Sequence, residues 1–176
     1  MSVNFFKEAC KGSSKKSVFG ICDDVDADGN TSKPAYLAED NGGKWIATVD
    51  NHYRDNIDFY AVDNCVTFPL REDGKLSKRC DGFLVLDDII AFVELKSRNE
   101  YGSKWVSDAE KQLRKAIYYF EKEKKSSEYN EKRAYVVNNM RPQARISQAE
   151  RMERFLDETG YLLFIKARIS LHNLEG

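Results

Sequence analysis

Residues 80–96 read CDGFLVLDDIIAFVELK, in which two apolar runs flank a pair of aspartates. Each run has the β-branched and aromatic composition of a half-buried strand. A hairpin with a two-residue loop at 87–88 places Asp81 directly opposite Glu94. A four-residue loop keeps this register, whereas a three-residue loop breaks it. The stretch therefore predicts two adjacent strands with a carboxylate on each, facing one another across the sheet.

Like charges this close destabilise a sheet unless solvent, a shared proton or a cation offsets them. Lys96 lies two residues after Glu94 and so projects from the same face, and the backbone carbonyl of Leu95 adds another hard oxygen. Such oxygen ligands suit Mg²⁺ or Mn²⁺, and a neighbouring lysine can orient an attacking water or stabilise developing negative charge. The simpler alternative is a surface ion pair between Glu94 and Lys96 at a strand end.

The 176 residues predict a single domain over 1–176, with a possible insertion or extra β region at about 23–64. Hydrophobic residues make up 41% and charged residues 32%, which is ordinary for a soluble globular protein. No apolar run reaches the roughly 20 residues of a membrane span, and the N-terminal sequence does not resemble a signal peptide. We therefore expect a cytoplasmic protein with no membrane partner.

The net charge of −1 gives no strong basic field, which argues against non-specific binding along a long stretch of nucleic acid. The four cysteines are widely spaced and contain no CxxC pair, so we expect buried thiols and no zinc site. They are Cys10, Cys22, Cys65 and Cys80. In the acidic segment 23–43, the twelfth position of a calcium loop that begins at Asp24 is Ala35, so the glutamate that closes such a loop is absent. This segment is therefore predicted to be a solvated loop.

Apolar periodicity and turn residues predict a mixed α/β (α+β) protein, with a central mixed sheet flanked by helices. The clearest helix covers 103–123, with Ser103 as its N-cap and one apolar stripe. The second helix covers 147–159, with Ser147 as its cap and Gly160 as its stop. The apolar stripe of the helix over 103–123 consists of Trp105, Ala109, Leu113, Ala116, Ile117 and Phe120. The other expected elements are a short helix over 3–11 with Phe5 and Phe6 inward, strands over 44–49, 57–62, 65–70, 133–139 and 161–171, and a charged turn over 71–79.

The sequence resembles the PD-(D/E)xK nuclease superfamily at Cys80-Asp81-Gly82 and at Phe92-Val93-Glu94-Leu95-Lys96. The similarity continues into the helix that contains Trp105 and Gln112-Leu113, and covers roughly residues 65–140. It implies a restriction-endonuclease-like core and a Mg²⁺-dependent or Mn²⁺-dependent phosphodiesterase. Asp81 and Glu94 would be metal ligands and Lys96 the catalytic lysine. The position before Asp81 is Cys80, where many members have proline.

Two further catalytic candidates come from branches of this superfamily. Gln112 corresponds to a glutamine that some branches carry near the active site, and it lies at the edge of the apolar stripe, in line with Trp105. The tyrosine that often follows four residues later is replaced by Ala116. Glu8 corresponds to a glutamate on the first helix that reaches a metal-bound water. The alternative for Gln112 is an ordinary polar residue at a helix edge. The alternative for Glu8 is a solvated residue or one that interacts with Lys7 or Lys11.

Lysines and arginines beside the predicted site are candidates for binding substrate phosphates, although such clusters are more often solvated faces. The expected function is a metal-dependent nuclease acting on nucleic acid, DNA ahead of RNA, in restriction, phage defence or repair, as a homodimer or with a partner protein. The alternatives are an inactive binding or assembly module of the same fold and a hydrolase of small phosphodiesters. The candidate phosphate-binding residues are Lys75, Lys78, Arg79, Lys111, Arg114 and Lys115.

Overall fold

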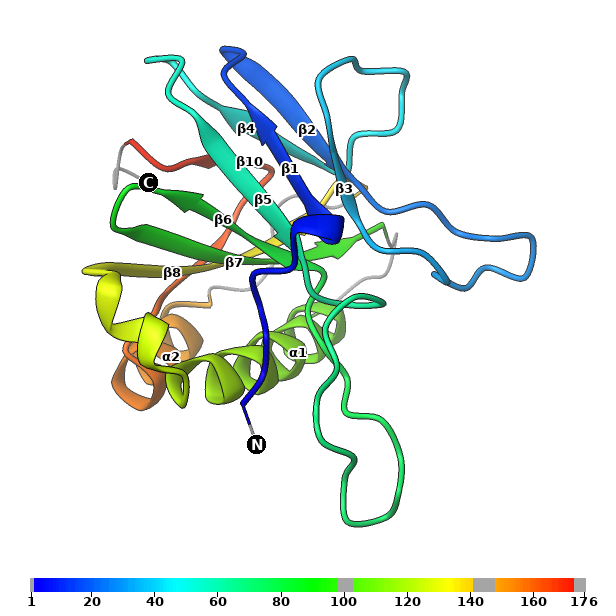
Figure 1. Ribbon diagram of the computed structural model, residues 1–176, viewed down its shortest axis with the longest axis vertical. Coiled ribbons are helices and arrows are strands. Elements are labelled where there is room, and N and C mark those ends of the chain that lie inside the picture. The colour runs from blue at the N-terminus through cyan, green and yellow to red at the C-terminus, as the bar shows by residue number, and fades with distance from the viewer. Residues whose placement is uncertain (1, 98–102, 141–147, 173–176) are drawn as a thin grey trace.

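The computed structural model describes residues 2–97, 103–140 and 148–172, and within these ranges the protein has three layers (Figure 1). A six-stranded sheet in the order β1-β5-β6-β7-β8-β9 forms the middle layer. Two helices cover one face, and a four-stranded sheet in the order β10-β4-β2-β3 covers the other. The elements are η1 (Glu8–Cys10), β1 (Lys11–Ser14), β2 (Val18–Cys22), β3 (Tyr36–Ala38), β4 (Ala47–Asp50), β5 (Ile57–Ala61), β6 (Gly82–Leu86), β7 (Ile89–Lys96), α1 (Lys104–Glu121), η2 (Lys124–Glu128), β8 (Glu131–Asn138), α2 (Ala149–Thr159), β9 (Leu162–Ile165) and β10 (Arg168–Ser170).

The central sheet is mixed, as the sequence predicts. Strands β5, β6 and β7 are antiparallel neighbours, whereas β7, β8 and β9 run parallel. Parallel neighbours need a crossover connection, and α1 and α2 lie in the two crossovers. Both helices pack on the same face of this sheet, where Trp105 of α1 and Phe155 of α2 belong to one apolar cluster.

The hairpin of residues 80–96 has the predicted register, and of the two loop lengths that allow it the structure has the two-residue loop, since Leu86 pairs with Ile89. Phe83 pairs with Phe92, and the last bridge at the open end joins Gly82 to Val93. Asp87 in the loop has a φ of 51°, a left-handed conformation that aspartate tolerates in turns. Both strands are apolar on both faces, because the helices cover one face and the four-stranded sheet covers the other.

Helix α1 confirms the predicted helix and its apolar stripe, whose six residues are all buried. Ser103 occupies the N-cap position, although its side chain makes no capping hydrogen bond. Helix α2 ends at Gly160, which has a φ of 78° as a left-handed cap requires. The predicted cap Ser147 lies outside the described residues.

The predicted helix over 3–11 is wrong. Only the single 3₁₀ turn η1 forms there, and the chain then enters β1, which pairs with β5 at the sheet edge. Phe5 is nevertheless buried, since its ring packs edge-on against Phe92 and Phe120. The aromatic contacts hold this segment in an extended form, so tertiary packing decides its conformation.

Four other expected elements also differ from the structure. The stretch 65–70 forms no strand, and Pro69 within it lacks the N–H that a ladder needs. The stretch 161–171 is two strands, because the chain leaves the central sheet after β9 and joins the other sheet as β10 beside β4. The loop at 23–43 contains the short strand β3, and the strand expected at 44–49 begins only at Ala47.

The prediction of buried thiols is correct for Cys22 and Cys80 and wrong for the other two cysteines. Cys10 and Cys65 form a disulfide across 55 residues of sequence. Cys10 directly precedes β1, and Cys65 follows β5, its antiparallel partner. Strand pairing therefore brings together two cysteines whose sequence spacing gives no sign of it. Among the described residues, neither helix has the length and apolarity to cross a bilayer.

Candidate metal-dependent active site

The three residues of the predicted centre lie together at the open end of the β6–β7 hairpin. Asp81, Glu94 and Lys96 are 8%, 2% and 7% exposed. Nζ of Lys96 lies 2.7 Å from Oε1 of Glu94, and the backbone N–H of Leu95 donates to Oδ2 of Asp81 at 2.6 Å. Their burial argues against the alternative of a solvated ion pair at a strand end.

The local sequence explains this arrangement. Alternate residues of β7 face the helices, so Glu94 and Lys96 follow Phe92 on that face of the sheet. Asp81 lies one residue before β6. If the β6–β7 register is continued by one pair beyond Gly82 and Val93, Asp81 lies opposite Glu94. Gly82 allows the close approach of β5, because a Cβ there would lie 2.4 Å from the Phe59 ring and 2.5 Å from the Tyr60 carbonyl oxygen.

Gln112 reaches this centre from α1. Its Oε1 accepts a 2.8 Å hydrogen bond from Nζ of Lys96, and its Nε2 donates at 3.0 Å to the carbonyl oxygen of Arg79. The amide thus links the lysine to the backbone of the segment that leads into β6. This contact favours the active-site interpretation of Gln112 over that of an ordinary residue at a helix edge.

The structure adds two carboxylates that the sequence analysis did not select. Asp23 directly follows β2 of the second sheet, and its side chain is within hydrogen-bonding reach of Asp81. Asp63 follows β5 and is held beside β6, because its backbone N–H donates to the carbonyl oxygen of Cys80. The charge of Asp63 acts on both Asp23 and Glu94. The available signal was an aspartate at the end of an apolar strand, which is too common to single out either residue.

These acids perturb one another. Burial, followed by the charge of Glu94, raises the pKa of Asp81 well above its usual range. Burial raises the pKa of Glu94 to about 7, although Lys96 acts in the opposite direction. Burial and the charge of Asp63 raise the pKa of Asp23 to about 6. Crowded, desolvated carboxylates with raised pKa values are typical of functional sites.

The donor set fits a hard divalent cation. Oε2 of Glu94 is buried and accepts no hydrogen bond from an N–H donor, while the Glu94 and Asp81 carboxylates lie within hydrogen-bonding reach of each other, a spacing that a bound cation or a shared proton would stabilise. Among the described residues, no three His, Cys, Asp or Glu side chains form a ready-made metal cage. Mg²⁺ is commonly held by one or two carboxylates together with waters and substrate phosphates. Asp81, Glu94 and the carbonyl of Leu95 could supply such a partial set.

Glu8 does not join this centre. Its side chain is 80% exposed, and its ion pair is with Lys11, 3.9 Å away. Lys11 in turn lies 3.8 Å from Asp58 on β5. With η1 replacing the predicted helix, Glu8 lacks the scaffold that would direct it toward Asp81. The solvated alternative describes its surroundings better.

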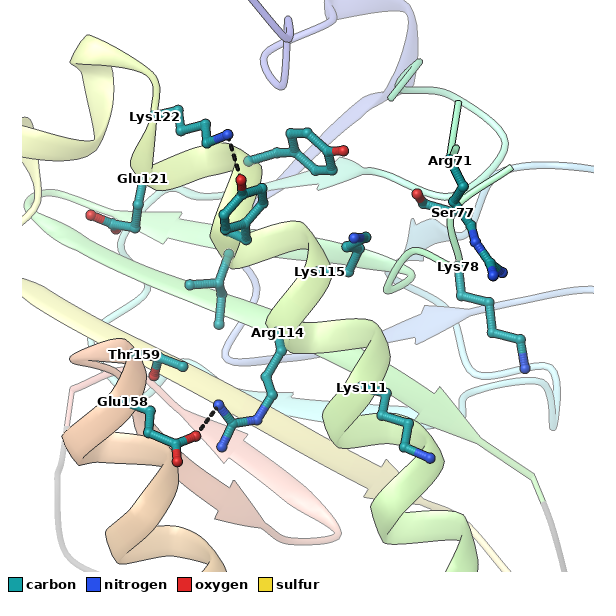
Figure 2. A pocket seen from close by; sticks show the side chains of 13 residues that line it. Arg71, Ser77, Lys78, Lys111, Arg114, Lys115, Glu121, Lys122, Glu158 and Thr159 are labelled. Atoms are coloured by element: carbon teal, nitrogen blue, oxygen red, sulfur yellow. Dashed lines mark hydrogen bonds and ion pairs between the residues drawn. The ribbon is translucent and has the colours of Figure 1, made fainter. Parts of the chain in front are cut away.

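A cleft of about 1030 Å³ lies between α1, the 71–78 segment and the end of α2 (Figure 2). We call it the basic cleft. It contains four of the six predicted phosphate-binding residues, namely Lys78, Lys111, Arg114 and Lys115. Its other lining residues are Arg71, Ser77, Ile117, Tyr118, Tyr119, Glu121, Lys122, Glu158 and Thr159.

The other two predicted phosphate-binding residues lie elsewhere. Lys75 is exposed in the turn, and its backbone N–H donates to Asp73. Arg79 donates from Nη1 to the carbonyl oxygen of Val66 and lies 3.3 Å from Asp63 through Nε. Arg79 therefore supports the segment that precedes Asp81 and partly balances the acids.

Comparison of the chain with protein-family models, curated proteins and solved structures finds no match.

Proposed function

We propose that the protein is a metal-dependent nuclease with a restriction-endonuclease-like core, hydrolysing phosphodiester bonds in nucleic acid, with DNA as the first candidate substrate. The observation that carries this proposal is the buried contact set of Asp81, Glu94 and Lys96 at adjacent strand ends. The buried Oε2 of Glu94, which accepts no hydrogen bond from an N–H donor, supports a cation ligand in the same place. The strand order supports the core, because the antiparallel β5–β6–β7 unit is followed by α1 and the parallel strand β8.

In this proposal each residue has a role that its position allows. Asp81, Glu94 and the carbonyl of Leu95 hold Mg²⁺ or Mn²⁺, which when bound lowers the pKa of a water and polarises a phosphate oxygen. Lys96 orients the attacking water or stabilises the negative charge that develops on the phosphate. Gln112 positions Lys96, since it accepts a hydrogen bond from the ammonium group.

The test is cleavage of plasmid DNA, single-stranded DNA and RNA with Mg²⁺, with Mn²⁺ and with EDTA. We expect metal-dependent cleavage by the wild-type protein and a loss of about 100-fold or more in Glu94→Ala and Lys96→Ala. The matched controls are Glu153→Ala and Lys15→Ala, which replace exposed residues on α2 and in the β1–β2 connection. These controls should cleave at the wild-type rate.

The result separates the competing functions. Hydrolysis of a small phosphodiester such as bis(p-nitrophenyl) phosphate, without cleavage of any polymer, would favour a small-molecule hydrolase. Equal cleavage by Glu94→Ala, Lys96→Ala and wild type would contradict the assigned centre. Absence of cleavage by well-folded wild-type protein with either metal would favour the inactive binding module.

A further inference from the structure

We infer that the basic cleft binds single-stranded nucleic acid, with the lysines contacting phosphates and Tyr118 stacking on an unpaired base. This inference rests on the proposed function and specifies its substrate class. Figure 2 shows the labelled cations on two walls, with Lys111, Arg114 and Lys115 along α1 and Arg71 and Lys78 on the segment across from it.

The free positive charge of the cleft comes from its lysines. Arg114 already contacts Glu110 and Glu158, and Arg71 contacts Asp73. Glu121 is likewise engaged by Lys132, so it adds little free negative charge. The remaining cations have no carboxylate partner among the residues that the structure describes. They are Lys78, Lys111, Lys115 and Lys122.

The aromatic part of the cleft suits an unpaired base. Tyr118, in the last turn of α1, is 53% exposed. Lys122 donates to its hydroxyl at 2.7 Å and has its Nζ 4.0 Å from the ring centre, whereas Nζ of Lys115 lies 5.8 Å from the ring centre. Basic grooves with exposed aromatic rings bind single strands, because an unpaired base offers its face for stacking. A duplex keeps its base faces stacked inside and gives Tyr118 no such partner.

The cleft is next to the proposed catalytic centre along the chain, although none of its lining residues belongs to that centre. Lys111 directly precedes Gln112 in the sequence, and Lys78 directly precedes Arg79. Gln112 donates a hydrogen bond to the carbonyl oxygen of Arg79 and accepts one from Lys96. From Lys111 to Lys122 the helix rises about 16 Å, enough for a few nucleotides. A strand lying in the cleft would therefore approach the Asp81 end of the hairpin past Gln112.

The experiment is fluorescence anisotropy with labelled 12-nucleotide probes in EDTA, where binding is measured without cleavage. The probes are single-stranded DNA, single-stranded RNA and duplex DNA of the same sequence. We expect tighter binding of a single strand than of the duplex. Tyr118→Ala should weaken single-strand binding by about tenfold and leave duplex binding unchanged. Comparing the DNA and RNA strands tells which of them the cleft prefers.

Charge and ring controls complete the test. Lys111→Gln should reduce the slope of log affinity against log salt by about 0.7, as expected for one lost phosphate contact on a single strand. Lys15→Gln and Tyr53→Ala replace an exposed lysine and an exposed tyrosine outside the cleft and should change nothing. Equal binding by Tyr118→Ala and wild type, a preference for duplex, or no binding at low salt would overturn the inference.

The binding experiment and the cleavage experiment can fail independently of each other. Metal-dependent cleavage that persists unchanged in Tyr118→Ala and Lys111→Gln would keep the nuclease and reject the cleft. Single-strand binding that depends on Tyr118, without cleavage under any metal, would keep the cleft and reject the nuclease.

Discussion

The backbone N–H of Leu95 donates a 2.6 Å hydrogen bond to Oδ2 of Asp81. This contact joins the residue before β6 to the end of β7, beyond the last bridge of the hairpin at Gly82 and Val93. It fixes Asp81 beside the two candidate site residues that flank Leu95, namely Glu94 and Lys96. The centre is therefore held by backbone geometry, and its charged side chains can be changed singly without removing that hydrogen bond.

Asp81→Asn should stabilise the metal-free protein. Asparagine keeps an oxygen that can accept from Leu95, while the repulsion between Asp81 and the acids Glu94 and Asp23 is removed. In EDTA we expect the melting temperature to rise by about 2–4 °C, as for a gain of about 1 kcal/mol. The wild-type protein should gain stability on adding Mg²⁺, and the variant should gain far less.

Thermal unfolding of both proteins, with and without Mg²⁺, checks this prediction, with Glu153→Gln as an exposed isosteric control. A lower melting temperature of Asp81→Asn in EDTA would show that the carboxylate stabilises the fold by itself. Equal stabilisation of both proteins by Mg²⁺ would exclude Asp81 as a ligand.

Gln112→Ala should lower kcat by about 10-fold to 100-fold with little change in KM, because Lys96 loses the acceptor that orients it. Gln112→Glu keeps an acceptor for Lys96 and should recover part of the rate. Steady-state cleavage kinetics distinguish the two variants, with Lys104→Ala at the exposed start of α1 as the control. A change in KM alone would assign Gln112 to substrate binding.

Gly82→Ala should destabilise the protein by about 1–3 kcal/mol, because the new methyl group would overlap the Phe59 ring and the rigid carbonyl of Tyr60. Gly42→Ala is the matched control, since nothing lies within 4 Å of a Cβ there. Its effect should stay within about 0.5 kcal/mol. Urea unfolding measures both, and equal stabilities would show that β5 and β6 can separate at no cost.

Reduction of the Cys10–Cys65 disulfide should lower the free energy of unfolding by about 2–4 kcal/mol, since the bond closes a long loop in the unfolded chain. The Cys10→Ser/Cys65→Ser double variant should have the stability of the reduced protein and should not respond to dithiothreitol. Denaturant unfolding with and without reductant checks this. A response of the double variant to reductant would instead point to Cys22 or Cys80.

Sequence patterns correctly predicted the features of the fold that depend on a few neighbouring residues. The register of the hairpin follows from the spacing of its apolar runs, and the stripe of α1 follows from helical periodicity. The same reasoning failed at 3–11, where Phe5 is buried through contacts with Phe92 and Phe120, far along the chain. It also failed at 161–171, because a run of apolar residues does not tell which of two sheets each part will join.

The central contact of this protein follows from local sequence, since alternation along a strand places Glu94 and Lys96 on one face, and the hairpin register places Asp81 opposite. Long-range packing brings Asp23 in from the second sheet, places Asp63 beside Cys80, and joins Cys10 to Cys65. It also brings the lysines of α1 and of the 71–78 segment into one cleft. The reason is physical: backbone periodicity acts over a few residues, whereas these contacts depend on how whole layers pack.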